Sequence, residues 1–419
     1  MVKYSCEQCG KEFSQKSHYV SHSRRKTPCD NNADNIKQLV DKEVGEKLNN
    51  ENLIIEKLII ENDVSNDDKE DMDIVEITQP DQPGFNEQKQ KQKQKKKKKL
   101  KLVDSKLNFI DLFAGTGAFS LALERNNKFK CVFTNDMMEC SKKIYELNNP
   151  QHKFTLQDLN TISVEDIPSH NLLCGGFPCQ PFSIAGDKKG FDDKRSNVFW
   201  KIVEILKKHM PEIIILENVK NLKSHDKGNT YKIIESKLQE IGYHIKSSIL
   251  DTNKITSIPQ HRERIYIVGF LDKEKYDKFN FDFIQQDQGK ICDFLEENID
   301  DKYYYTDRFK VFAEIEKGIT KNISENVLYQ YRRFYVRENK SNCCPTLTAN
   351  MGGGGHNVPL LKDDKGIRKL TPRECFNLQG FPPDYKLPDV CDSSLYKLAG
   401  NAVSVPVVNL IVNKLEGII

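Results

Sequence analysis

From Lys106 onward, short apolar runs alternate along the chain with segments of helical periodicity. The apolar runs, which we interpret as buried strands, are 108–113, 130–135, 171–174, 212–216 and 264–270. Helical patterns lie between them at 119–125, 141–147, 199–208 and 231–241. A repeated strand–helix order brings the strands together in a parallel sheet with helices on both faces. The sequence therefore predicts an α/β domain with a doubly wound, mostly parallel sheet over residues 105–270.

The last third of the chain has a different residue pattern. Residues 271–385 lose the alternation and contain aromatic, basic and glycine clusters, which predicts a smaller, irregular domain. Helical patterns return at 395–398 and 403–415. We expect residues 386–419 to form a C-terminal segment that returns to the α/β domain.

Residues 31–104 are dominated by Asn, Asp, Glu, Lys and Gln. A segment with so few apolar residues cannot offset the entropy lost on folding, so we expect a disordered, charged linker. It contains a lysine-rich run at 93–101. Three interpretations of this run stay open: a nuclear address, a tail that contacts DNA phosphates, and a plain solvated linker.

Composition also indicates where in the cell the protein is expected. No apolar run approaches the roughly 20 residues that span a bilayer, and the N-terminus has no signal segment. Twelve cysteines in 419 residues indicate free thiols in a reducing compartment rather than a disulfide scaffold. We therefore expect an intracellular protein, in cytoplasm or nucleus, that makes no use of a membrane. Its cysteines are available as nucleophiles or metal ligands.

The first 30 residues contain a compact set of candidate metal ligands, namely Cys6, Cys9, His22 and Cys29. Twelve residues separate Cys9 from His22, a spacing that resembles the hairpin and helix of a zinc finger. The six residues between His22 and Cys29 are more than usual. A unit this small has little core without metal, so structural zinc would hold its fold. Residues 1–30 thus predict a small ββα-like finger, with cysteines in a disordered tail as the alternative.

A glycine-containing turn follows the first strand. Gly115 and Gly117 allow the backbone to approach a ligand and start a helix tightly. A full dinucleotide motif would place a third glycine at Ser120, so a purely structural turn stays open. Asp136 and Asp158 follow later strands and fall at the same carboxyl edge, where such sheets bind ligands. This combination favours a nucleoside without a pyrophosphate, which points to S-adenosylmethionine.

The apolar runs at 171–174 and 212–216 are followed by residues suited to covalent chemistry. Cys179 lies in a Pro-Cys-Gln-Pro sequence whose fixed dihedrals suit a nucleophile at a strand end, although a lone cysteine is more often a small core residue. Glu217 is placed to hold or protonate a ring nitrogen, with a surface salt bridge as the alternative. Arg262 and Arg264 offer guanidinium donors for a carbonyl oxygen or a phosphate.

Taken together and in this order, these segments resemble the motifs of the DNA (cytosine-5) methyltransferases. The resemblance covers residues 106–419 and rests on stretches 109–117, 176–180, 217–219, 260–264, 370–374, 379–382 and 400–403. It implies the fold of S-adenosylmethionine-dependent methyltransferases, to which the zinc finger would be an addition. It also implies double-stranded DNA as the partner of a monomer, and residues 271–385 as the target-recognition domain.

The resemblance further implies roles for single residues. Cys179 would add to ring carbon 6 of a flipped cytosine while Glu217 hydrogen-bonds ring nitrogen 3. Arg264 would hold the ring oxygen, with Arg262 beside it as a further catalytic residue. The adenine, ribose and amino-group contacts of the cofactor would come from Phe113, Asp136 and Asp158. The rest of the cofactor pocket would comprise Gly115, Gly117, Met137, Leu159, Asn401 and Ala402.

Two other functions stay open at this point. One is cytosine-5 methylation of transfer RNA, because a branch of the family modifies that substrate. The other is a catalytically silent DNA-binding protein. A catalytically silent protein would be expected to have a damaged motif, whereas Cys179, Glu217 and Arg264 are all present. The target base sequence does not follow from the chain.

Overall fold

The computed structural model describes residues 4–5, 12–13, 106–125, 127–178, 197–319, 327–332, 335–339, 341–351 and 359–419. Met1–Gln90 and Lys91–Ile419 form two separate compact units. In the first, β1 (Tyr4–Ser5) pairs antiparallel with β2 (Glu12–Phe13). The predicted nucleophile Cys179, the linker 31–104 and the zinc ligands Cys6, Cys9, His22 and Cys29 lie outside the described residues.

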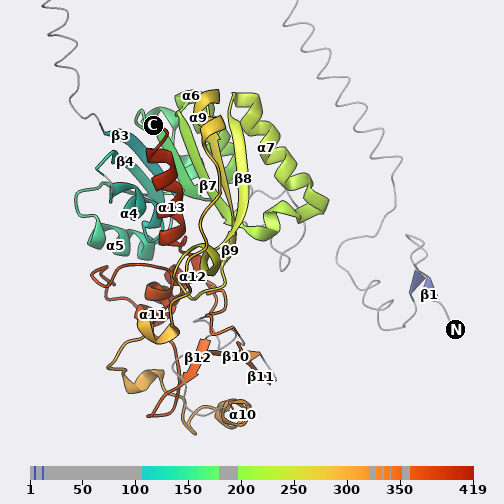
Figure 1. Cartoon of the computed structure of the whole chain (residues 1–419), viewed down its shortest axis with the longest axis vertical. Helices are drawn as coiled ribbons and strands as arrows, with labels where there is room; N and C mark the ends of the chain where they lie inside the picture. Colours follow the sequence, from blue (N-terminus) through green and yellow to red (C-terminus); the bar gives the residue numbers. More distant parts are fainter. Residues whose placement is uncertain are drawn as a thin grey trace, which may run out of the picture. The chain divides into compact units, whose positions relative to one another are not determined.

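A seven-stranded sheet forms the centre of the larger unit (Figure 1). In spatial order its strands are β5 (Phe154–Leu156), β4 (Phe129–Asp136), β3 (Leu107–Leu112), β6 (Leu172–Gly176), β7 (Ile213–Val219), β9 (Glu263–Phe270) and β8 (His244–Asp251). Neighbours from β5 to β7 run parallel, and β9 runs antiparallel to β7 and β8. The predicted mostly parallel sheet is confirmed. Its strand order reverses between β3 and β6, where such sheets bind ligands at their carboxyl edge.

Helices cover both faces of this sheet. On one face, Phe109 and Leu172 pack in a core with helices α4 (Ala118–Glu124), α5 (Glu139–Asn148) and α13 (Val405–Glu416). On the other face, Ile110 and Leu173 pack with α6 (Asn197–His209) and α7 (Asn229–Ile241). Successive strand residues point to opposite faces and both faces are buried, which explains why the central strands are continuous apolar runs.

A smaller antiparallel sheet lies within the segment that we expected to be irregular. Its order is β11 (Tyr335–Glu338), β10 (Tyr329–Arg332), β12 (Pro359–Lys362) and β13 (Ile367–Lys369). Helix α10 (Phe312–Gly318) shares a separate core with it. The expectation of an irregular structure is therefore wrong for these residues. Strands of three or four residues are too short to show an alternating pattern in sequence.

Four further helices lie between or after the strands of the two sheets. They are α8 (Thr252–Ile255), α9 (Lys273–Lys278), α11 (Pro372–Leu378) and α12 (Asp392–Asn401). Helix α13 packs against α4, and the Tyr385 hydroxyl donates a hydrogen bond to the Thr116 carbonyl at 2.7 Å. By length and composition, Asp392–Glu416 is apolar enough to cross a membrane, yet 72% of its most apolar window is buried in the protein. Its place in the core accounts for that composition.

Candidate functional site

The chain turns sharply where β3 ends. Phe113, Gly115 and Gly117 have positive φ angles of 56°, 52° and 71°, a region that glycine adopts freely and phenylalanine only with strain. A Cβ atom at Gly117 would lie 2.9 Å from the Tyr145 ring. Glycine is therefore required at position 117, and the strained Phe113 marks this turn as a functional candidate.

Asp136 ends β4 beside this turn. Its carboxylate accepts hydrogen bonds from the backbone amides of Gly115, at 3.0 Å, and Met138, at 2.8 Å. Burial raises the pKa of Asp136, while these amide bonds oppose the rise. Each carboxylate oxygen can accept a further donor, which suits ribose hydroxyls. The next side chain, Met137, is 69% exposed and offers an apolar surface at the same edge.

Asp158 lies close to Asp136 through the pairing of β4 with β5. Asp136 is opposite Leu156, the last residue of β5. Asp158 caps the 3₁₀ turn Leu159–Thr161, and its exposed carboxylate accepts from the Asn160 amide at 3.0 Å. Leu159 is buried in the core below. The structure thus brings together the two acids that were predicted for the cofactor.

The C-terminal segment reaches the same edge from the other side. Asn401 ends α12 with an exposed side chain, and Ala402 is buried. A Cβ atom at Gly176, the last residue of β6, would lie 3.3 Å from the Cγ2 atom of Val403. Residues 401–403 therefore adjoin the end of β6, between the cofactor turn and the predicted chemistry.

Glu217 and Arg264 form a buried pair at the ends of β7 and β9. The Nε atom of Arg264 lies 3.2 Å from Oε1 of Glu217, and their side chains are 15% and 10% exposed. Burial raises the pKa of Glu217, against the opposing effect of Arg264 and Arg262. A raised pKa favours a protonated carboxyl group that donates a hydrogen bond. The alternative of a surface salt bridge does not fit this burial.

Gly176 lies directly beside this pair. It lies opposite Glu217 in the β6–β7 pairing, and a Cβ atom there would lie 3.3 Å from Oε2 of Glu217. The Nδ2 atom of Asn218 donates to the Phe177 carbonyl at 3.1 Å, which fixes the chain after β6. The next residues in sequence are Pro178 and Cys179. The role of Cys179, which is outside the described residues, stays a prediction.

Arg262 occupies a different environment from Arg264. Its side chain is 2% exposed, with Nη1 donating to the Leu347 carbonyl at 3.0 Å. Nη2 donates to the carbonyls of Gly400 at 3.1 Å and Ala402 at 2.6 Å. Burial lowers its pKa to about 9. Protein carbonyls engage both terminal nitrogens, so this geometry favours a positioning residue over the predicted catalytic one.

Sequence reasoning missed a buried polar chain beside the glycine turn. Asp111 accepts hydrogen bonds from the amide and hydroxyl of Ser120, at 3.2 and 2.7 Å. The Ser120 hydroxyl lies 2.8 Å from that of Tyr145, which lies 3.0 Å from Nδ1 of His152. Burial raises the pKa of Asp111 to about 7. Serine stands where the dinucleotide motif has its third glycine, and its hydroxyl donates to Asp111. The available signal was an acid inside an apolar strand.

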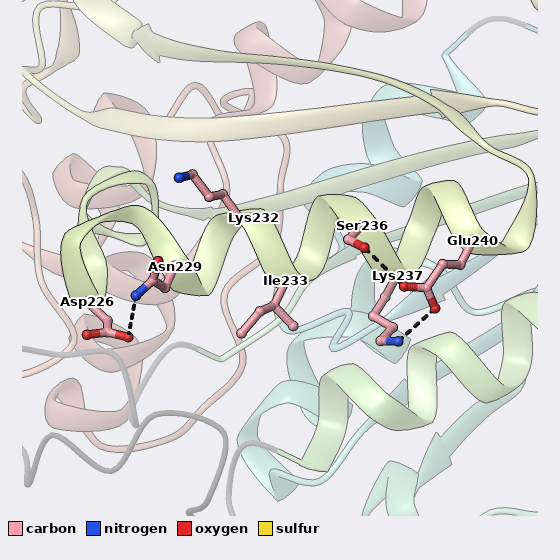
Figure 2. Close-up of a pocket in the computed structure, with 7 residues that line it drawn as sticks. All are labelled: Asp226, Asn229, Lys232, Ile233, Ser236, Lys237 and Glu240. Atoms are coloured by element: carbon pink, nitrogen blue, oxygen red, sulfur yellow. Dashed lines mark hydrogen bonds and ion pairs between the residues drawn. The ribbon is translucent and has the colours of Figure 1, made fainter.

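A shallow hollow of about 490 Å³ lies on the outer side of α7, apart from these residues (Figure 2). It is lined by Asp226, Asn229, Lys232, Ile233, Ser236, Lys237 and Glu240. Within it, Glu240 pairs with Lys237 at 2.7 Å and with the Ser236 hydroxyl at 3.0 Å. None of the predicted site residues lines this hollow, and its charges are largely satisfied. We interpret it as a solvated helix surface.

Comparison with known proteins identifies the family. The model of the family described as C-5 cytosine-specific DNA methylase matches residues 107–417. The chain belongs to this family. The methyltransferase is 47% identical over 309 residues to the Type II methyltransferase M.Bsp6I of Bacillus sp. (strain RFL6), covering 73% of this chain and 97% of that protein. It is 38% identical over 313 residues to M1.ScrFI of Lactococcus lactis subsp. cremoris, covering 74% and 78%.

Solved structures share the fold of the methyltransferase. The Entamoeba histolytica methyltransferase EhMeth has a TM-score of 0.59 at 21% identity, covering 75% of this chain and 98% of that one. The S. pombe Dnmt2 methyltransferase has a TM-score of 0.58 at 24% identity, covering 74% and 99%. At these identities the likeness establishes the fold alone. The predicted family and enzyme class are confirmed: the protein is a DNA (cytosine-5) methyltransferase, and its methyl donor is S-adenosylmethionine.

Proposed function

We propose that the methyltransferase modifies a cytosine that is flipped out of double-stranded DNA, with Cys179 as its nucleophile. The observation that supports this most is the buried pair of Glu217 and Arg264, with Nε and Oε1 at 3.2 Å. The pair lies beside Gly176, just upstream of Cys179 in the sequence. A protonatable carboxyl and a guanidinium thus adjoin the segment that carries the thiol.

The reaction begins with extrusion of the cytosine, because a thiolate must approach the ring face; this costs a few kcal/mol. Cys179 Sγ then bonds to carbon 6, and the electron pair of the carbon 5–carbon 6 double bond makes carbon 5 nucleophilic. Glu217 donates its proton toward ring nitrogen 3, and Arg264 holds the ring oxygen. S-adenosylmethionine, when bound, supplies the methyl group to carbon 5. A water molecule takes the carbon 5 proton, the electron pair of that bond restores the double bond, and the Cys179 thiolate is expelled.

The residues at the carboxyl edge fit a nucleoside ligand. We assign Phe113 to the adenine ring, Asp136 to the ribose hydroxyls and Asp158 to the adenine amino group. Asp136 keeps lone pairs that can accept further hydrogen bonds, and the Asp158 side chain is exposed. The remaining lining is assigned to Gly115, Gly117, Met137, Leu159, Asn401 and Ala402. Arg262 is assigned to positioning, since three carbonyls already engage it.

Trapping on a duplex that contains 5-fluorocytosine tests the covalent step, because fluorine at carbon 5 cannot leave as a proton does. With S-adenosylmethionine supplied, the native protein should form an adduct that survives a denaturing gel, and Cys179→Ala should form none while retaining its affinity for S-adenosylmethionine. Cys391→Ser is the matched control. Cys391 is exposed, and side-chain hydrogen bonds from Ser393 and Ser394 lower its pKa to about 7. An adduct formed by Cys179→Ala would refute the assignment.

DNA is favoured over transfer RNA as the substrate. The relatives at 47% and 38% identity are named Type II methyltransferases, and the same names support a role in protecting DNA from a partner restriction endonuclease. Duplex DNA and transfer RNA, assayed side by side with a labelled methyl donor, should give label in DNA alone. Label in transfer RNA alone would overturn the choice. Bisulfite sequencing of a plasmid that expresses the protein would give the target site.

The N-terminal residues are proposed to form a zinc finger. Support comes from the β1–β2 pair, in which Tyr4 lies opposite Phe13 and which encloses Cys6 and Cys9 in the sequence. Among the described residues no group of His, Cys, Asp or Glu is arranged for a metal. Elemental analysis of the full chain should find one zinc per chain, and Cys6→Ser should lose it. A zinc content that Cys6→Ser leaves unchanged would contradict the proposal.

The proposed organisation follows the predicted boundaries. The finger occupies 1–30, the linker 31–104, the catalytic domain 105–270, the target-recognition domain 271–385 and the C-terminal segment 386–419. We expect the protein to act on DNA as an intracellular monomer. Light scattering of the full chain with and without duplex DNA would test the monomer.

A further inference from the structure

The β10–β11 hairpin of the small sheet has one polar face. In its register Gln330 lies opposite Arg337, and Arg332 lies opposite Tyr335. Directly opposed residues and residues two apart share a face of a strand pair, so these four side chains lie together. Arg332, Tyr335 and Arg337 are exposed, Tyr335 by 60%. We call these four residues the outer face.

The inner face of the same hairpin is used for packing. Tyr329, Tyr331 and Val336 join the small core that includes α10. The end of α10 approaches so closely that a Cβ atom at Gly318 would lie 2.5 Å from the Cβ of Val336. The small domain therefore has its core on one side of the hairpin. Tyr335, Arg332 and Arg337 lie on the opposite face of the hairpin and do not contribute to that core.

The outer face is also positively charged. The Nη2 atom of Arg332 donates to Oε1 of Gln330 at 3.0 Å, and Gln330 is only 5% exposed. The buried Gln330 side chain thus orients this exposed guanidinium. Neither Arg332 nor Arg337 forms an ion pair with any residue that the structure describes. Exposed, uncompensated arginines beside an aromatic ring are typical of a nucleic-acid surface.

We propose that the outer face reads guanine in the target DNA, with Arg332 and Arg337 as specificity-determining residues; this rests on the proposed function. The major groove admits a two-stranded β-ribbon, and its guanine edge offers the O6 and N7 acceptors that match the two donors of an arginine. Gln330 acts through Arg332 as a positioning residue. Tyr335, exposed on the same face, supplies an apolar contact with the DNA.

The chain that follows the hairpin in sequence contacts the residues just before β9, the strand that carries Arg264. Cys344 and Gln260 form an isolated parallel β-bridge, and the His261 amide donates a hydrogen bond to the Cys344 carbonyl at 2.8 Å. The Leu347 carbonyl then accepts from Arg262 at 3.0 Å, two residues before Arg264. A short connection therefore joins the proposed reading surface to the strand that carries Arg264. A base contact on the hairpin would fix where along the duplex the flipped cytosine lies.

The test compares variants of the full chain on DNA. Once bisulfite sequencing has given the native site, kcat/KM is measured on that site and on duplexes with each guanine replaced in turn. Arg332→Ala and Arg337→Ala should each lower kcat/KM on the native site by roughly tenfold to a hundredfold and flatten the preference at one guanine. Arg332→Lys keeps the positive charge but loses the paired guanidinium donors, so it should behave like Arg332→Ala. Arg308→Ala, an exposed arginine outside the hairpin, is the control and should change neither.

Two outcomes would overturn the inference. A uniform loss on all duplexes, with a shallower dependence on salt, would place the arginines on phosphates rather than bases. Unchanged rates and preference in all hairpin variants would remove the outer face from recognition. Affinity for S-adenosylmethionine should stay at the native value in each variant, which excludes misfolding. Failure of the native protein to methylate any duplex would instead refute the proposed function, and this inference with it.

Discussion

Replacing Asp111 with asparagine tests whether a buried carboxyl group makes the stability of the methyltransferase depend on pH. Asp111 is fully buried and accepts two hydrogen bonds from Ser120. Asparagine has nearly the same shape and keeps an oxygen acceptor for both bonds, but it carries no charge. The variant therefore removes the ionisation and leaves the polar contacts to Ser120 in place.

The size of the effect follows from the pKa of Asp111, which burial raises from 3.8 to about 7; Asp136 adds to the rise, and Ser120 and His152 oppose it. Between these values the folded state holds a proton that the unfolded state has released, so the free energy of unfolding falls as pH rises. At about 1.4 kcal/mol per pKa unit, the ionised group costs roughly 4 kcal/mol above pH 7. Below about pH 4 both states are protonated and the cost disappears. Asp111→Asn should therefore gain about 3 kcal/mol over the native protein between about pH 5 and pH 8.

Urea unfolding of both proteins across that pH range, followed by the fluorescence of the single tryptophan, measures this difference. Asp384→Asn, at an exposed aspartate, is the matched control and should track the native curve at every pH. If the curves for Asp111→Asn and the native protein run parallel from acid to base, the carboxyl is not protonated by burial, and the reasoning fails.

Four further predictions follow from the site. Arg262→Met should lower the free energy of unfolding by at least about 3 kcal/mol, because three buried carbonyls lose their donor; urea unfolding would show partial recovery in Arg262→Lys. Glu217→Gln should lower kcat by about 10² to 10⁴ in single-turnover assays with little change in cofactor affinity; an unchanged kcat would contradict its role as proton donor. Asp136→Asn should weaken S-adenosylmethionine binding about tenfold in calorimetry, and an equal Kd would oppose the ribose assignment. Gly380→Ala should lower Tm, because φ is +84° and a Cβ atom would lie 2.3 Å from Cδ of Pro406; an unchanged Tm would contradict it.

The sheet was predictable where burial is complete and less so at its edges. The apolar run at 212–216 predicts a strand because both faces of β7 are covered, and the structure has Ile213–Val219 there. The edge strand β8 was missed. Its sequence includes Lys246, Ser247 and Ser248, which are only partly buried. A strand with one neighbour needs no continuous apolar run, so neither the run nor a clear alternation appears in its sequence.

The candidate site was predictable as a set of residues but not as a set of contacts. Glu217 and Arg264 each stand out by their place at a strand end. Their contact depends on β9 pairing antiparallel with β7, which no local pattern encodes. Arg262 and Arg264 are two residues apart and chemically identical, and sequence alone assigns both to catalysis. The carbonyls that distinguish Arg262 come from Leu347 and from the end of α12, far along the chain.

Those carbonyls belong to a set of hydrogen bonds that ties the start of β9 to later segments of the chain. The Gln260 side chain donates to the Leu378 carbonyl at 2.7 Å, and the Gln379 side chain to the Ala399 carbonyl at 2.7 Å. With Arg262, three buried polar side chains thus bind backbone carbonyls of other segments, and each would be costly to leave unpaired. Because these bonds end on the backbone, the side chains of the partner segments take no part in them. The segment around Leu347 is therefore held against the start of β9 through its backbone, and the Leu347 side chain is itself buried in the core.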